Sequence, residues 1–392
     1  MRRMRLMCAP LWKVSVAAVL LAAATALHAG AVPDTKGGPI GNQVLIAGGE
    51  DSGGNALDSA ELYDPKLQTF TLLSTTMSEP RAHHTCTRIN GKLILIAGGE
   101  NSSTTALATA DLFSVKTRTL TPTHENMVSA QSGQTATLTK ANKVLIAGGI
   151  DDTGAVTGVA ENYKGAGGGT FSATANPLRT KREFHTATRI ARGLVLITGG
   201  IDQNGNVLQR AEIFNIANGT FNYTLGNMVN RRTNHTATLL PNGNVLIAGG
   251  YGGNGNPQNT AEIYNPGKRS FTPTLSAMNF ARAEHTATLL AGGGVLIAGG
   301  FTSNAKITST AEIYDSTSGT FTAVGPKMTD SRAGHTATLL KNGTVLIAGG
   351  LDQSGAIVNT AELYNPAGTG SFKATKNPMN AERIYHTATL IQ

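Results

Sequence analysis

The chain has 392 residues, of which 47 are glycine and 14% are charged, and its formal net charge is +8. That charge is too small and too evenly scattered to favour nucleic acid or a membrane surface as a partner, and part of it comes from the first 31 residues. Two cysteines, Cys8 and Cys86, exclude a fold held by several disulfides, and a single all-β domain can reach this length.

The N-terminus has the composition of a secretory signal peptide. A basic stretch ends at Lys13, the apolar run 14–27 follows, and small residues surround Ala29 and Ala31. The apolar run is short for a membrane span, although an uncleaved anchor is the alternative. We therefore predict a signal peptide over 1–31, cleaved after Ala29 or Ala31, a linker over 32–41 and a secreted or periplasmic domain over 42–392. Cys86, alone in that domain, is expected to be a small buried hydrophobe.

An internal repeat organises the rest of the chain. The motif Val-Leu-Ile-Ala-Gly-Gly recurs with small variations every 50 or 51 residues. Its glycine pairs begin at Gly48, Gly98, Gly148, Gly199, Gly249, Gly299 and Gly349. Such regularity predicts seven copies of one structural unit.

Each repeat contains the pattern of four short strands. In one repeat the first strand is predicted over 235–240, followed by a turn that contains Asn242-Gly243. The second is the apolar run 245–248, the third alternates over 260–264, and the fourth centres on Phe271. Four antiparallel strands per unit predict the blades of a β-propeller.

The two ends of the domain complement each other. The first repeat begins with a second strand at 43–45, whereas the last stops after a first strand at 386–392. Joined in space, these segments complete one blade and remove an unpaired sheet edge. The sequence thus predicts seven blades closed by the C-terminal strand.

Two aromatic positions follow each glycine pair. The first is occupied by Tyr63, Phe113, Tyr163, Phe214, Tyr264, Tyr314 and Tyr364, and the second by Phe70, Leu120, Phe171, Phe221, Phe271, Phe321 and Phe372. Glycine pair and aromatics together resemble the kelch repeat, although that family usually has tryptophan at the second position. The resemblance covers about 42–392 and is greatest to exported bacterial kelch proteins and the central propeller of galactose oxidase. It implies an all-β, seven-bladed kelch β-propeller. The copper chemistry of galactose oxidase is not expected to carry over, and no cofactor is predicted.

Three further side chains recur in almost every repeat. Histidine occurs at His84, His185, His235, His285, His335 and His386; arginine three residues earlier at Arg81, Arg182, Arg232, Arg282, Arg332 and Arg383; and an acid on the third strand at Glu61, Asp111, Glu161, Glu212, Glu262, Glu312 and Glu362. Equivalent positions in different blades are too far apart to share one metal, so no metal site is predicted. We interpret the set as a structural acid–Arg–His hydrogen-bond network.

One repeat departs from this pattern. Gln131 replaces the arginine, Gln134 the histidine, Asp111 the glutamate and Leu120 the aromatic. Four departures within one period suggest that the groups belong to one network. The functional alternative is a ring of arginines that grips an acidic ligand.

A candidate binding rim follows from the strand directions. The residue after each glycine pair should lie at the same end as the Arg-x-x-His loop, and these residues differ between repeats: Glu50, Glu100, Ile150, Ile201, Tyr251, Phe301 and Leu351. Arg231 is assigned to the same rim. Tyr251 and Phe301 either bind a sugar or a partner protein there, or fold inward and plug the channel.

The sequence contains no nucleophile elbow, phosphate-binding loop or paired-cysteine zinc motif, so no catalytic residue is predicted. The first hypothesis is an extracytoplasmic binding or interaction propeller whose ligand is a glycan or a protein. A carbohydrate-active enzyme similar to the kelch-fold sialic acid mutarotase is the alternative, and a structural surface protein is the third. No nucleic-acid partner is expected, and no membrane span after removal of the signal.

Overall fold

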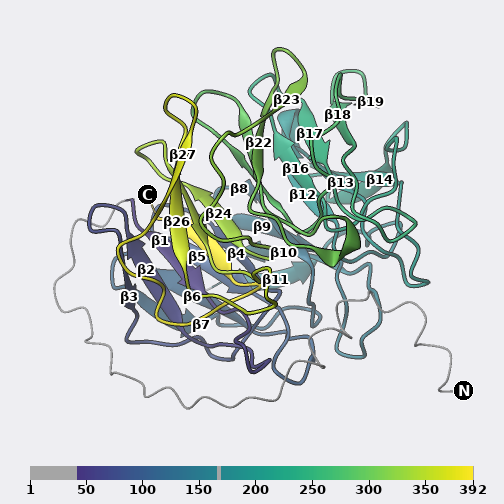
Figure 1. Ribbon diagram of the computed structural model, residues 1–392. Helices are drawn as coiled ribbons and strands as arrows, with labels where there is room; N and C mark the ends of the chain where they lie inside the picture. Colours follow the sequence, from purple (N-terminus) through teal and green to yellow (C-terminus); the bar gives the residue numbers. More distant parts are fainter. Residues whose placement is uncertain (1–41, 166–168, 392) are drawn as a thin grey trace, which may run out of the picture. The chain divides into compact units, whose positions relative to one another are not determined.

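The computed structural model describes residues 42–165 and 169–391. The predicted signal peptide (1–31) and linker (32–41) lie outside these residues. The described part contains seven four-stranded antiparallel sheets, each with its strands in hairpin order (Figure 1). The predicted all-β propeller of seven blades is therefore confirmed.

The blades are numbered here in chain order. Blade 1 contains β28 (Thr387–Leu390), β1 (Val44–Ala47), β2 (Ala60–Asp64) and β3 (Thr69–Leu72); blade 2 contains β4 (Thr85–Arg88), β5 (Leu93–Ala97), β6 (Ala110–Ser114) and β7 (Thr119–Pro122); blade 3 contains β8 (Thr135–Lys140), β9 (Lys143–Ala147), β10 (Ala160–Lys164) and β11 (Thr170–Ala173); blade 4 contains β12 (Thr186–Ile190), β13 (Leu194–Thr198), β14 (Ala211–Asn215) and β15 (Thr220–Tyr223); blade 5 contains β16 (Thr236–Leu239), β17 (Val245–Ala248), β18 (Ala261–Asn265) and β19 (Ser270–Pro273); blade 6 contains β20 (Thr286–Leu289), β21 (Val295–Ala298), β22 (Ala311–Asp315) and β23 (Thr320–Ala323); and blade 7 contains β24 (Thr336–Leu339), β25 (Val345–Ala348), β26 (Ala361–Asn365) and β27 (Ser371–Ala374). Two short 3-10 turns, η1 (Ala191–Gly193) and η2 (Ser303–Ala305), lie in loops.

The hydrophobic core lies between neighbouring blades. Val245 and Ile247 of β17 are fully buried against Leu196 and Met228 of the preceding repeat. A strand that is covered on both faces has no solvent side, which explains its continuous apolar run. The two repeated aromatic positions meet within one blade, as in the Tyr264–Phe271 pair, whose ring centroids are 4.7 Å apart. Seven hydrophobic clusters of this interblade kind hold the described blades together.

The C-terminal strand closes the circle of blades. β28 pairs antiparallel with β1, from Val44 opposite Leu390 to Ala47 opposite Thr387. Each first strand also contacts the first strands of both neighbouring blades, and β28 contacts β24 and β4. Figure 1 accordingly places the end of the chain beside β1. The predicted closure is confirmed.

The strand order gives the propeller two unlike ends. One end, called the axial end here, carries the glycine pairs and the Arg-x-x-His loops, because second strands finish there and first strands start there. At the hairpin end lie the turns that join first to second and third to fourth strands. Among the described residues, no helix is long and apolar enough to cross a membrane.

Candidate functional site

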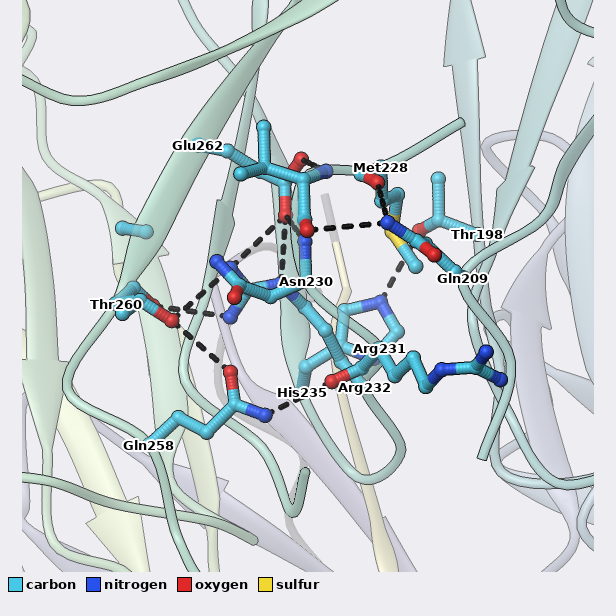
Figure 2. A network of polar contacts seen from close by, with 12 residues as sticks. Thr198, Gln209, Met228, Asn230, Arg231, Arg232, His235, Gln258, Thr260 and Glu262 are labelled. Carbon is cyan, nitrogen blue, oxygen red and sulfur yellow. Dashed lines mark hydrogen bonds and ion pairs between the residues drawn. The ribbon is translucent and has the colours of Figure 1, made fainter. Parts of the chain in front are cut away.

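The repeated arginine forms a buried ion pair with the acid of its own blade. In blade 5, Arg232 Nε donates to Glu262 Oε1 (2.9 Å), and Nη1 donates to the carbonyl oxygens of Gly249 (2.8 Å) and Thr260 (3.0 Å) (Figure 2). Glu262 Oε2 accepts the backbone N–H of Val229 at 2.6 Å. The pair thus ties the loop before the first strand to the second and third strands.

The same pairing occurs in six of the seven blades. It joins Arg81 to Asp111 (3.1 Å), Arg182 to Glu212 (2.8 Å), Arg232 to Glu262 (2.9 Å), Arg282 to Glu312 (2.9 Å), Arg332 to Glu362 (3.0 Å) and Arg383 to Glu61 (3.1 Å). These side chains are 0% exposed, so their guanidinium groups cannot reach a ligand. Their burial speaks against the alternative of an arginine ring that grips an acidic ligand. The last pair also links the two ends of the domain.

The histidines do not join this ion pair, contrary to the predicted three-part network. Nε2 of His235 is hydrogen-bonded to Thr186 Oγ1 and Thr198 Oγ1, both at 3.1 Å, which lie in blade 4 (Figure 2 shows Thr198). The other histidines bond in the same way to the first strand of the preceding blade: His84 to Thr387, His185 to Thr135, His285 to Thr236, His335 to Thr286 and His386 to Thr336. Burial, aided by Arg182, lowers the pKa of His185 to about 3, so this histidine is neutral. Arginine therefore holds a blade together, whereas histidine links it to its neighbour.

The departures from the repeat belong to two blades, not to one network. Asp111 lies in blade 2 and is paired with Arg81. Gln131 and Gln134 precede β8 and therefore belong with Glu161 in blade 3. A repeat counted along the sequence runs across the boundary between blades, which is why the sequence grouped Asp111 with the two glutamines.

Glu161 is consequently a buried carboxyl without its arginine. Its Oε2 accepts the backbone N–H of Val128 at 2.7 Å, whereas its Oε1 has no partner among the described residues. Gln131 Nε2 donates to the carbonyl of Val159 (3.0 Å), and Gln134 Nε2 to that of Ala97 in blade 2 (2.9 Å). Burial raises the pKa of Glu161 to about 7.

Each glycine pair makes room for two Arg-x-x-His loops. A Cβ on Gly249 would lie 2.5 Å from the carbonyl oxygen of Arg282 in the next blade, and one on Gly250 would lie 2.5 Å from that of Thr233. Both glycines also have positive φ, +62° and +88°. The glycine pair is therefore required by close packing and by backbone conformation together.

The predicted rim residues follow these glycines and pair with the same loops. Isolated bridges join Glu50 to Ile384, Glu100 to Ala82, Ile150 to Ser132, Ile201 to Glu183, Tyr251 to Thr233, Phe301 to Ala283 and Leu351 to Ala333. All seven rim residues are partly exposed. Tyr251 and Phe301 are among them, and the backbone of each pairs with an Arg-x-x-His loop.

The seven residues that directly precede the histidine positions, one in each blade, are joined by backbone hydrogen bonds into a closed circle. The sequence had not predicted this circle. These axial residues are His83, Gly133, Phe184, Asn234, Glu284, Gly334 and Tyr385. The backbone N–H of each donates to the carbonyl of the preceding one, at 3.1 to 3.4 Å, so that seven hydrogen bonds close on themselves. All seven have positive φ, although five are not glycine. The left-handed conformation is costly for such side chains, and costs of this kind concentrate at functional sites.

Four of the axial side chains, those of His83, Phe184, Glu284 and Tyr385, form a cluster. The rings of His83 and Tyr385 are stacked at 4.1 Å, and Phe184 approaches His83 edge-on at 6.2 Å. Gly334 leaves room for the side chains of Ile384 and Tyr385, because a Cβ there would lie 2.8 Å from the former and 3.1 Å from the latter. The Tyr385 hydroxyl donates to Glu284 Oε2 at 3.4 Å.

Carboxylates set the electrostatics of this cluster. His83 Nε2 lies 3.8 Å from Glu100 Oε1. Burial raises the pKa of Glu284 to about 7, and burial together with the neighbouring Glu100 and Asp51 raises the pKa of Glu50. Burial and then the charge of Glu284 also raise the pKa of Tyr251. Carboxylates beside aromatic faces form a site that suits a cation or a hydroxyl-rich ligand.

Arg231 lies in the loop before β16 and is not one of the axial residues. It borders an open depression of about 600 Å³ whose lining includes Gln209, Asn230 and Gln258. Gln258 Nε2 donates to the Arg231 backbone carbonyl at 2.8 Å, and the guanidinium contacts the Val207 carbonyl at 3.4 Å (Figure 2 labels Arg231 and Gln258). Val207 is itself bridged to the rim residue Ile201, so the guanidinium contacts a segment that pairs with the rim.

Within 42–165 and 169–391, no group of three His, Cys, Asp or Glu side chains is arranged to hold a metal ion. Burial raises the pKa of the Cys86 thiol to about 11.

The axial residues could have been noticed in the sequence. The position before each repeated histidine differs between most blades, although its neighbours recur.

The comparisons with known proteins identify one repeat. Residues 38–77 match the family described as the Kelch motif. This span contains β1, β2 and β3 of blade 1, with its glycine pair and both aromatics. No curated protein matches the chain.

Proposed function

Because the chain is a kelch-repeat β-propeller, we propose that it is an extracytoplasmic binding protein that holds a partner at its axial end. The observation that carries this proposal is the circle of axial residues. The same groups recur in six of the seven blades, whereas five different non-glycine side chains occupy strained positions around one axis. The composition of residues 1–31 supports the extracytoplasmic location.

The chemistry of the axial cluster favours a partner with positive charge. Glu50, Glu100 and Glu284 supply carboxylates, and Tyr385 and Phe184 supply aromatic faces. A lysine or arginine of a partner protein could pair with the former and lie over the latter. A sugar acid lacks such complementarity here, since the network arginines are fully buried.

Binding of the full chain to arrays of basic peptides and of neutral and acidic glycans tests this proposal. We expect selective binding to basic peptides, lost in the double variant Glu100→Gln/Glu284→Gln. The matched control is Glu382→Gln, in the same loop series but outside the axial circle. Equal binding by the double variant would place the partner elsewhere on the propeller, and binding to glycans alone would favour the carbohydrate hypothesis.

A further inference from the structure

Three lysines lie side by side across blade 3 at the hairpin end. Lys140 of β8 is opposite Lys143 of β9, which is also opposite Lys164 of β10. Directly opposed side chains in antiparallel strands are close neighbours, and like charges there are destabilising. None of the three forms an ion pair with a described residue. The row therefore carries an uncompensated repulsion in the free protein.

Blade 3 departs from the other blades at these positions. Lys164 stands where the other repeats have Asp64, Ser114, Asn215, Asn265, Asp315 and Asn365. Asp64 and Asn265 each accept backbone N–H groups of the following turn, at 2.8 and 2.9 Å. A lysine side chain has no acceptor atom, so Lys164 cannot accept such a bond. Lys143 stands where blades 2 and 4 have Leu93 and Leu194.

A cavity of about 400 Å³ lies among these lysines. Asn162, Thr170 and Ser172 complete its lining. Asn162 is the polar exception at a third-strand position that is leucine or isoleucine in the other repeats: Leu62, Leu112, Ile213, Ile263, Ile313 and Leu363. Its Oδ1 is buried and has no hydrogen-bond partner among the described residues.

The first strand of blade 3 is also irregular at this end. A shift in register between Leu138 and Lys140 marks a bulge, whereas the other ladders among the described strands are regular. Bulges redirect the side chains that follow them. Here the redirected residue is Lys140, the outer member of the lysine row.

Basic residues continue from this row onto both neighbouring blades. The hairpin turns of blades 2 to 4 and the strand ends that flank them carry Arg88, Lys92, Lys116, Arg118, Lys140, Lys143, Lys164, Arg189 and Arg192, and their sequence contains no Asp or Glu. Acidic residues gather instead on the axial-end loops, among them Glu50, Asp51, Glu100, Asp151 and Glu284. The hairpin end of blades 2 to 4 is therefore basic, because equivalent turns of successive blades lie at the same end.

We propose that the hairpin end of blade 3 is a binding site for a phosphate-type oxyanion, held by Lys140, Lys143 and Lys164. Three ammonium groups supply the charge, and the Thr170 and Ser172 hydroxyls supply further donors. The flanking basic turns extend the site toward a ligand that carries several anionic groups. This site lies at the opposite end from the axial residues and does not depend on the function proposed for them.

Pyrophosphate binding to the full chain tests the site, measured by calorimetry and by the thermal unfolding midpoint at constant ionic strength. We expect saturable one-to-one binding that raises the midpoint. Lys164→Asn, which installs the residue of three other blades, should weaken binding by about tenfold or more. Without pyrophosphate it should unfold at the wild-type temperature or above, because it removes the repulsion.

Lys341→Asn, in the hairpin turn of blade 7, is the matched control and should bind as the wild type does. Inorganic phosphate and vesicles of phosphatidylglycerol distinguish a small soluble anion from a lipid headgroup, and binding in either arm should depend on Lys164. The proposal is overturned if the wild type binds none of these probes, or if Lys341→Asn loses as much affinity as Lys164→Asn.

Discussion

Blades 5 and 3 have the same strand order but not the same interior. In blade 5, Arg232 pairs with Glu262 and His235 reaches into blade 4. In blade 3, Gln131 and Gln134 take the places of arginine and histidine, and Glu161 is left without a cation. Blade 3 nevertheless keeps its full ladder of strands. Strand pairing and interblade packing therefore suffice to form a blade, and the ion pair adds stability to it.

The comparison also separates two roles that the repeat presents together. The arginine acts inside a blade, and the histidine acts between blades. Blade 3 replaces both and carries the lysine row at its hairpin end. The following predictions use this difference, in order of expected effect.

The largest effect is expected from the network arginine. Arg232→Ala leaves Glu262 buried without its partner, and loss of one member of a buried pair costs about 3–5 kcal/mol of unfolding free energy. Gln131→Ala, the equivalent change in blade 3, removes one neutral hydrogen bond and should cost about 1 kcal/mol. Chemical denaturation of both variants checks this. Equal losses would mean that the ion pair contributes nothing specific.

The next effect concerns pH. The pKa of Glu161, about 7 in the folded protein, lies above the ordinary value of 4.5. The folded state then binds more protons than the unfolded state between these values, so the unfolding free energy contributed by this group falls as pH rises. Glu161→Gln removes this contribution. The unfolding free energy of this variant, relative to that of the wild type, should therefore rise by about 3 kcal/mol between pH 4 and pH 8. Chemical denaturation of both proteins at each pH measures it.

Glu262→Gln supplies the contrast in blade 5. It should destabilise the protein at pH 8, because it removes the charge that Arg232 pairs with. If Glu161→Gln and Glu262→Gln respond to pH alike, the two buried carboxyls are not in different environments.

The smallest effect is expected at the histidine. His235→Gln places in blade 5 the residue that blade 3 has at this position, and should cost about 1 kcal/mol, the value of one neutral hydrogen bond. Burial holds the pKa of His235 well below its ordinary value, so this group's contribution is complete above about pH 6.5 and is lost as pH falls. The cost of the substitution should therefore shrink in acid. A cost that grows in acid would contradict a neutral buried histidine.

The fold could be predicted from the sequence because the same pattern recurs in seven repeats. The unmatched strands at 43–45 and 386–392 also indicated that the two ends of the domain pair and close the ring of blades. It also predicted the Arg–acid pairing. It could not assign Gln131 to Glu161, since that requires the boundary between blades. The axial circle escaped prediction because its backbone bonds join residues in different repeats, and the basic end escaped because charges far apart in the chain meet only once the blades are stacked.

In this propeller, repeated residues build the scaffold, and we propose that unrepeated axial residues serve binding. Arg282 and Glu284 test it most directly, since they stand two residues apart in one loop. The measurement is the thermal unfolding midpoint at pH 8. We expect Arg282→Ala to unfold well below the wild-type temperature. Glu284→Gln removes a carboxyl of raised pKa and keeps an acceptor for Tyr385, so it should unfold at the wild-type temperature or above. A fall for Glu284→Gln as large as that for Arg282→Ala would contradict it.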